Sequence, residues 1–251
     1  MVKTNDFFTA VNMVDNIPVN HDHIISTLIN TVQAMARVSY QGVCLIDYFS
    51  QSFLYVSDNP LFLCGHSAEE VKELGYRFYL QHVPKEEQNM LVELNSNGFK
   101  FFDRHNTKDR QKCYMIYNFH LQYGRKKILV THEITPVLFN DKGQTWIALC
   151  TVSPSVHKTP GHVQFHIEGS HRFWNYSFSS HKWEEKQGIT LTNDEKDVLI
   201  LSAEGFSTSE IAETMCKSLD SVKYYRRRLF EKLEVGNITE AVFRATIYKL
   251  I

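Results

Sequence analysis

The chain has 251 residues, of which 43% are hydrophobic, and its 27 Lys and Arg residues nearly balance its 28 Asp and Glu residues, for a net charge of −1. This composition suffices for one large domain or two ordinary ones, and it excludes a disordered chain, a collagen-like chain and a disulfide-stapled miniprotein. The charge balance excludes a polycationic coat protein but is compatible with a local basic patch.

The cysteines and the hydropathy pattern predict a cytoplasmic protein. The five cysteines are scattered and include no C-x-x-C pair, which is typical of reduced thiols. No apolar run approaches the roughly 18 residues that a membrane helix needs. The first residues lack the apolar core of a signal peptide. We therefore expect a soluble protein without a membrane partner.

Residues 1–41 predict a helical extension. Asn20 can cap a helix that runs through about Ser39. The apolar residues of that helix recur at i, i+3 and i+4 and form one stripe: Ile25, Leu28, Val32, Met35 and Ala36. Such a stripe fits a helix packed on its own domain, which we favour, and also a seam between two copies of the chain.

Residues 42–153 predict an antiparallel α+β domain. Runs rich in β-branched and aromatic residues occupy 42–49 and 52–57, and then 113–123, 126–139 and 145–153. Short helical segments lie between the two groups of strands, together with a longer helix over about 85–97. Two strands, a helical middle and three strands predict one sheet with its helices grouped on one side.

The segment VSDNPLFLCGHSAEEV at 56–71 resembles a PAS sensor domain. In that family the second strand is followed by Asn-Pro, an aromatic residue, Gly and Ser-x-x-Glu. The matching residues are Asn59, Pro60, Phe62, Gly65, Ser67 and Glu70. Ser67 and Glu70 also have the spacing of a capping box. The resemblance extends over 42–153 and implies a PAS-like sensor domain.

The sequence leaves the cofactor of this domain unknown. Haem-binding PAS domains usually carry a histidine on the long central helix, whereas His82 and His105 only flank that helix here. Cys64 does not match the motif of the flavin-binding light sensors. A core lined by Phe and Tyr can hold a small-molecule ligand or be packed solid. The resemblance therefore implies a sensor of a small molecule or of a protein partner.

Residues 154–187 predict a linker that contains a β-hairpin. Alternation over 161–185 indicates two strands with a turn at 168–170. One face of the hairpin is apolar: Val163, Phe165, Ile167, Trp174, Tyr176 and Phe178. We expect this face to dock on the sensor domain and to couple the two halves of the chain. Histidines here predict no metal site, because strand residues i and i+4 lie ~13 Å apart.

Residues 188–251 predict four helices. Four residues stand where each can cap a helix: Thr192, Ser207, Ser218 and Asn237. Three of these caps have Glu three residues later, as a capping box requires. The second helix is short, and a tight turn near Cys216 separates it from a longer third helix. This order predicts a helix-turn-helix.

The third helix separates apolar from basic side chains. Its core stripe, read at about 100° per residue, is Val222, Leu229 and Leu233. The opposite side of the helix carries Lys223, Tyr224 and Arg227, and Arg228 lies at the edge of that side. Residues 218–233 hold five basic and two acidic residues, which is the local charge that phosphate binding requires. An isolated helix of this kind would be a solvated surface, but the capped short helix before it favours DNA binding.

Residues 190 to about 248 resemble the LuxR/GerE-type DNA-binding domain over roughly its full length. The matches are Leu191-Thr192, Glu195, Val198-Leu199, Ala203-x-Gly205, Ser207, Glu210-Ile211-Ala212, Ser218, Val222-Lys223, Lys232-Leu233, Val235 and Glu240-Ala241-Val242. The resemblance implies a double-stranded DNA partner and a homodimer, and it makes RNA polymerase a candidate partner. It implies that Lys223, Tyr224 and Arg227 reach base edges or nearby phosphates. The remaining predicted DNA-binding residues are Arg228, Tyr225, Arg226, Ser221 and Thr192, with Tyr225 standing where the family often has histidine.

Together these features predict a sequence-specific DNA-binding transcriptional regulator that is controlled by its PAS-like domain. The motifs G-x-G-x-x-G, G-x-x-x-x-G-K-[ST], H-E-x-x-H and G-x-S-x-G are absent from the sequence, so we expect no catalytic residues and no enzyme. Asp47 stands alone at a strand end, which disfavours a phospho-accepting receiver domain. The alternative is a non-enzymatic protein-interaction scaffold with a PAS-like dimerisation domain, which the basic helix disfavours.

Overall fold

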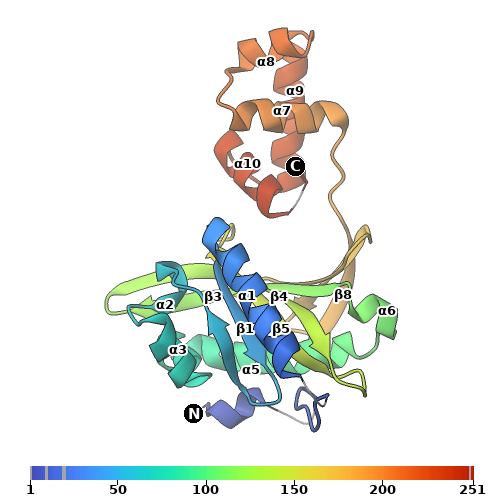
Figure 1. Ribbon diagram of the computed structural model, residues 1–251. Coiled ribbons are helices and arrows are strands. Elements are labelled where there is room, and N and C mark those ends of the chain that lie inside the picture. The colour runs from blue at the N-terminus through green and yellow to red at the C-terminus, as the bar shows by residue number, and fades with distance from the viewer. Residues whose placement is uncertain (1, 9–10, 19–20, 249) are drawn as a thin grey trace. The chain divides into compact units, whose positions relative to one another are not determined.

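The computed structural model describes residues 2–8, 11–18, 21–248 and 250–251 (Figure 1). The chain divides into two compact units, Met1–Lys186 and Gln187–Ile251. The sequence places Asn20 at a helix start, but this residue lies outside the described residues. The following helix, α1, spans Asp22–Val38.

The first unit is built on one eight-stranded sheet with the order β2-β1-β5-β4-β3-β6-β7-β8. Its strands are β1 (Gly42–Asp47), β2 (Ser52–Val56), β3 (Cys113–Tyr123), β4 (Lys126–Phe139), β5 (Thr145–Pro154), β6 (Val163–Ile167), β7 (Arg172–Ser177) and β8 (Lys182–Gln187). All neighbours from β2 to β7 pair antiparallel. The first five strands therefore have the PAS-like order that the sequence predicts: two strands, a helical middle and three strands.

Helices cover both faces of β1. The segment between β2 and β3 forms α2 (Pro60–Leu63), α3 (Ala68–Leu74), α4 (Arg77–His82), α5 (Lys85–Phe102) and α6 (Thr107–Arg110), and a short 3-10 helix, η1, spans Thr4–Phe7. Cys44 and Ile46 share a core with residues of α2 to α5, whereas Val43 and Leu45 share a core with α1. Because successive strand residues point to opposite faces, β1 is buried on both sides. Figure 1 shows α1 crossing β1 and β5.

The PAS-like motif after β2 acts through local hydrogen bonds. The Asn59 side chain accepts from the Leu61 N–H at 3.0 Å and begins α2. Ser67 and Glu70 form the predicted capping box of α3, in which the Glu70 carboxylate accepts from the Ser67 N–H at 2.7 Å. Gly65 has a φ of +87°, and a side chain there would collide with the ring of Tyr123 on the β3–β4 hairpin. The motif therefore sets the path of the chain from the sheet into the helices.

The predicted hairpin is part of the same sheet rather than of a separate linker. Residues 163–187 form three strands, and β6 pairs with β3 in a register that sets Met115 opposite Phe165. The sequence did not predict strand β8. The Trp183 ring of β8 stacks on the Phe101 ring of α5, with 4.6 Å between the ring centroids. The Tyr176 hydroxyl donates to Glu93 of α5 at 2.7 Å. The expected docking of the aromatic face on the sensor domain is confirmed.

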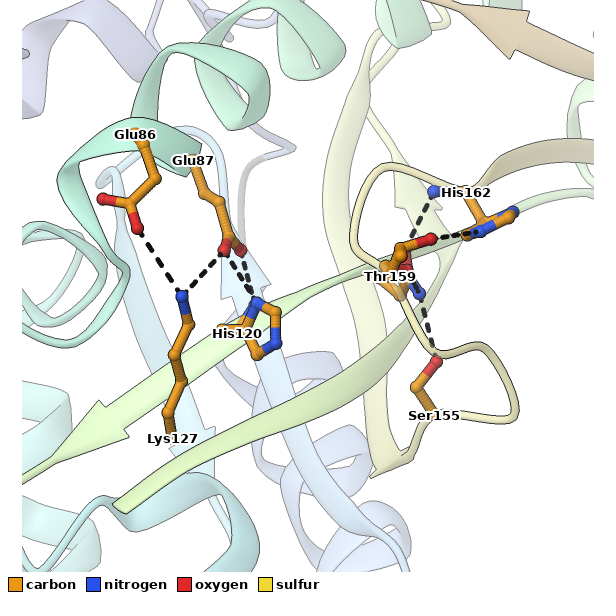
Figure 2. A network of polar contacts seen from close by, with 8 residues as sticks. Glu86, Glu87, His120, Lys127, Ser155, Thr159 and His162 are labelled. Atoms are coloured by element: carbon orange, nitrogen blue, oxygen red, sulfur yellow. Dashed lines mark hydrogen bonds and ion pairs between the residues drawn. The ribbon is translucent and has the colours of Figure 1, made fainter. Parts of the chain in front are cut away.

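Beyond the end of β6, a side chain rather than a neighbouring strand bonds to the backbone at the edge of β3. Beyond Tyr117, β6 no longer pairs with β3, and an unpaired edge would invite association with another strand. Glu87 of α5 accepts from the backbone N–H of His120 at 2.7 Å and lies 2.7 Å from His120 Nδ1. Lys127 of β4 lies 3.6 Å from the same carboxylate (Figure 2). The N-terminus of α5 is thereby fastened to the sheet.

Asn118 of β3 holds the segment that connects β5 to β6. Its amide nitrogen donates to Ser155 Oγ at 3.1 Å and to the Thr159 carbonyl at 2.9 Å, and its Oδ1 accepts from the His162 N–H at 2.8 Å. Figure 2 shows Ser155, Thr159 and His162 gathered on this segment. Residue 118 is 1% exposed, so these bonds are shielded from water.

The second unit consists of four helices: α7 (Asn193–Ala203), α8 (Thr208–Thr214), α9 (Leu219–Leu233) and α10 (Ile238–Ile247). All four predicted caps are present: the side chains of Thr192, Ser207, Ser218 and Asn237 each accept a backbone N–H of the first turn. Asn237 and Glu240 do not form a full capping box, because Glu240 accepts from the Gly236 N–H instead. Helix α9 ends at Glu234, whose backbone is in the left-handed conformation. This end lies one or two residues before the predicted end at 235–236.

Candidate nucleic-acid interface

The inner face of α9 anchors the helix in the core of the second unit. Its three core residues are the predicted ones: Val222, Leu229 and Leu233, each at most 1% exposed. They pack in one cluster with Val198 and Leu199 of α7 and Ile211 of α8. Burying three aliphatic side chains stabilises this arrangement by several kcal/mol, at about 1.5–3 kcal/mol each. The opposite face of α9 is consequently presented to solvent.

The outer face of α9 carries the predicted basic side chains. Lys223, Tyr224, Arg227 and Arg228 are all exposed, Tyr224 by 49%. The Arg227 guanidinium lies over the Tyr224 ring, 5.6 Å from its centroid. Lys223 lies 3.6 Å from Asp220, and Arg228 lies 3.9 Å from Glu231, both one helical turn away. Exposed pairs of this kind contribute about 0–1 kcal/mol, so phosphates can replace the carboxylates at little cost.

Two predicted DNA-binding residues have partners inside the unit instead. The Tyr225 hydroxyl donates to Asp194 Oδ2 at 2.6 Å, and Arg226 Nη1 donates to Thr208 Oγ1 at 2.6 Å. The Tyr225 hydroxyl, which the sequence predicts to contact DNA, is bonded within the unit because the first turn of α7 lies within reach of the phenol. Tyr225 and Arg226 hold α9 against α7 and α8.

Ser221 and Thr192 lie at helix N-termini. Ser221 Oγ lies 2.8 Å from Ser218 Oγ, the cap of α9. Thr192 Oγ1 accepts from the Glu195 N–H at 3.3 Å. A hydroxyl that accepts through its oxygen can still donate its proton, and helix N-termini attract phosphate groups. Both positions thus remain suited to the DNA contact that the sequence predicts.

Positioning residues that the sequence analysis missed lie on α7 and in the turn before α9. Asp194 Oδ2 accepts from Tyr225 and also from Lys217 Nζ, the latter at 3.2 Å. Glu195, which is 3% exposed, accepts from Lys232 Nζ at 2.7 Å. Burial alone raises the pKa of Glu195, but the hydrogen bonds from Lys232 and from the Thr192 backbone outweigh it and hold that pKa below its usual value. Glu195 was visible in the sequence as a cap partner, whereas no sequence signal singles out Asp194.

The first unit contains a cavity of about 80 Å³ between α5 and the sheet. Five tyrosines contribute to its wall: Tyr48, Tyr76, Tyr79, Tyr114 and Tyr117. Burial raises the pKa of each of these phenols, which therefore stay protonated. None of the described residues that line the cavity is charged. Of the two possibilities left open by the sequence, the structure has the cavity rather than a solid core.

The described ranges contain neither a candidate metal site nor a candidate membrane span. Among the residues whose placement is described, no group of three or more His, Cys, Asp and Glu side chains is arranged to hold a metal ion. Within the same residues, no helix combines the length and the apolar character needed to cross a bilayer.

Comparison with known proteins identifies the second unit. Residues 189–245 match the family model described as bacterial regulatory proteins, luxR family. Over 55 residues the chain is 44% identical to the transcriptional regulatory protein DesR of Bacillus subtilis (strain 168), a match that covers 22% of this chain and 28% of that relative. The second unit is a LuxR-type helix-turn-helix domain, in agreement with the resemblance found in the sequence.

Solved structures that are similar to the chain include two of VqmA. The phage VqmA–DPO complex has 13% identity, covers 90% of both chains and gives a TM-score of 0.33. The Vibrio cholerae VqmA dimer has 16% identity, covers 86% of both chains and gives a TM-score of 0.32. A light-oxygen-voltage domain with a flavin analogue has 17% identity, covers 54% of this chain and 87% of the other, and gives a TM-score of 0.35.

Proposed function

We propose that the protein is a sequence-specific DNA-binding transcriptional regulator in which the PAS-like unit controls the helix-turn-helix unit. The observation that carries this proposal is the division of α9 into two faces. Its inner aliphatic residues are buried in the core, whereas Lys223, Tyr224 and Arg227 are exposed side by side on the outer face. A helix held in this way can enter the major groove of DNA.

The roles of the outer side chains follow from their chemistry. Arg227 can donate two hydrogen bonds to the O6 and N7 atoms of guanine, and Lys223 can reach a base or a phosphate. Ser221 and Thr192 can donate to the DNA backbone and so set the register of the helix. As a homodimer the protein would read two half-sites about 34–36 Å apart. In a cytoplasmic regulator of this type, RNA polymerase is the further partner.

The cavity in the first unit supports the sensing of a small neutral molecule. Its volume of about 80 Å³ is of the order of half the roughly 150 Å³ of a cavity that takes up benzene. Protonated phenols can donate hydrogen bonds to such a ligand, and the uncharged wall disfavours an ion. The protein is proposed to be non-enzymatic, so a bound ligand would act by changing the conformation of α5 and the sheet.

Selection of duplexes from a random DNA library by the full-length protein tests DNA binding. We expect enrichment of a motif. The logarithm of the association constant for that motif should fall linearly with the logarithm of salt concentration, with a slope of about −0.9 per neutralised phosphate. Failure to enrich any motif, together with the absence of salt-sensitive duplex binding, would favour the interaction scaffold. Native mass spectrometry of the purified protein would detect a retained small molecule.

A further inference from the structure

Helix α1 has an apolar face that the fold leaves uncovered. Ile25, Leu28, Val32 and Ala36 pack on the β1–β5 side of the sheet, as the sequence predicts. Met35 does not join them: it is 39% exposed, on the same outer side as Ile24, at 47%, and Val38, at 89%. The predicted stripe was wrong in this one residue: Met35 lies about 20° around the helix from both Ile24 and Leu28, at the border of the sheet-facing set, and the structure leaves it exposed.

The outer stripe is symmetric about Thr31. Its members stand at −7, −4, 0, +4 and +7 from this residue: Ile24, Thr27, Thr31, Met35 and Val38. None of the five is charged. The Thr31 hydroxyl donates to the Thr27 carbonyl at 2.9 Å, so its polar atom is satisfied within the helix. The stripe can therefore be buried without stranding a charge or an unpaired hydroxyl.

We propose that α1 packs antiparallel against α1 of a second copy of the chain, with the two-fold axis at Thr31. This symmetry sets Ile24 of one copy opposite Val38 of the other, and Thr27 opposite Met35. The inference deepens the proposed function, in which the regulator binds DNA as a dimer, by assigning the dimer surface.

Charge and shape both favour a second copy as the occupant. An acidic or basic partner would find no complementary charge on the stripe, whereas two identical uncharged stripes meet without like-charge repulsion. In the antiparallel arrangement each large side chain meets a small or medium one, and the two helix dipoles oppose each other. A parallel pair would instead set Met35 against Met35 and Thr27 against Thr27, with the dipoles aligned.

The size of the stripe predicts a reversible dimer. Helix α1 has 17 residues and is about 25 Å long. One face of such a helix buries less than the roughly 800 Å² per partner of a standard stable interface. Dimerisation should therefore depend on protein concentration and be strengthened by DNA that carries two half-sites.

Disulfide crosslinking of α1 tests the proposal in the absence of DNA. The background is the full-length Cys216→Ser variant, because Cys216 is exposed whereas Cys44, Cys64, Cys113 and Cys150 are buried. Helix axes 8–10 Å apart bring two Cα atoms on the symmetry axis to roughly 4–6 Å, within the range of a disulfide. We therefore expect Thr31→Cys to crosslink to itself under mild oxidation with copper-phenanthroline. Gln33→Cys, on the polar side of the same helix, is the matched control and should stay monomeric.

A second pair of variants distinguishes the antiparallel from the parallel arrangement. Ile24→Cys should not crosslink to itself, because its two copies would lie about 20 Å apart. Ile24→Cys mixed with Val38→Cys should give a crosslinked heterodimer. The proposal is overturned if Thr31→Cys reacts no faster than Gln33→Cys, or if Ile24→Cys readily crosslinks to itself.

Sedimentation analysis provides the independent measurement. Met35→Glu combined with Val38→Glu should raise the dimer dissociation constant by about 100-fold, because it sets carboxylates together in the interface. Arg227→Ala should leave that constant unchanged. A wild-type protein that binds its selected duplex but gives the same constant as Met35→Glu/Val38→Glu would refute the α1 surface and leave the proposed function standing.

Discussion

The phenol of Tyr225 donates to Asp194 Oδ2 at 2.6 Å and thereby joins the recognition helix α9 to the first turn of α7. The same oxygen accepts from Lys217, in the turn between α8 and α9. The hydrogen bond from Tyr225, followed by that from Lys217, holds the pKa of Asp194 below its usual value. One partly buried carboxylate therefore organises the turn that precedes the DNA-facing helix.

Tyr225→Phe should alter the titration of Asp194 without removing a phosphate contact. Loss of the hydroxyl lets the pKa of Asp194 rise toward about 3.9. A lowered native pKa contributes stability that is fully present above about pH 4 and is lost as the pH falls below 4 and through the native pKa. The variant should therefore lose less stability in acid than the wild type. NMR titration would measure the pKa of Asp194, and urea unfolding at several pH values would measure the loss of stability in acid. The affinity for the selected duplex should stay the same; a loss of about 1.5–3 kcal/mol would instead show that the Tyr225 hydroxyl contacts a phosphate.

Arg227→Ala should weaken specific DNA binding without unfolding the protein. We expect a loss of about 1–3 kcal/mol of affinity for the selected motif. Arg226→Ala provides the contrast, because it breaks the bond to Thr208 and should lower the stability of the second unit. Lys196→Ala, at an exposed position of α7, is the control for removal of a cation. Full-strength binding by a folded Arg227→Ala protein would contradict the assignment of the outer face.

Lys232→Met should destabilise the second unit strongly. It leaves the carboxylate of Glu195 buried without its cation, which typically costs about 3 kcal/mol or more. The native pKa of Glu195 is lowered, so the ion pair stabilises the fold at pH 7 and its contribution disappears as the pH falls below about 4.3. Urea unfolding at pH 7 and pH 4 should show a larger difference from wild type at pH 7. Lys223→Met, which removes an exposed pair, should change stability by less than about 1 kcal/mol.

His132 should make the first unit sensitive to acid. His132 is fully buried, and its Nδ1 lies 3.1 Å from Cys150 Sγ. Burial lowers the pKa of His132 from 6.5 to about 3. Between these two values only the unfolded chain binds the proton, so stability falls as the pH is lowered, by on the order of 5 kcal/mol in total. His132→Phe should flatten this dependence in thermal unfolding between pH 7 and pH 4. His171→Gln, at an exposed site, should leave it intact; an unchanged slope in His132→Phe would refute the assignment.

Local chemistry made much of this architecture predictable from the sequence. Thr192, Ser207 and Ser218 each bond within one helical turn, so their roles depend only on neighbours a few residues away. The outward direction of Lys223 and Arg227 follows from helical periodicity once the apolar stripe has set the buried side.

Tertiary structure decided the contacts between distant residues. Tyr225 and Asp194 are 31 positions apart, and the bond exists only because the packing of α9 on α7 brings them together. Likewise, the attachment of β6 to β3, the exposure of Met35 and the cavity beside α5 depend on which surfaces meet. Periodicity determines the side on which a residue lies, whereas its partner is determined by the summed packing of the whole unit.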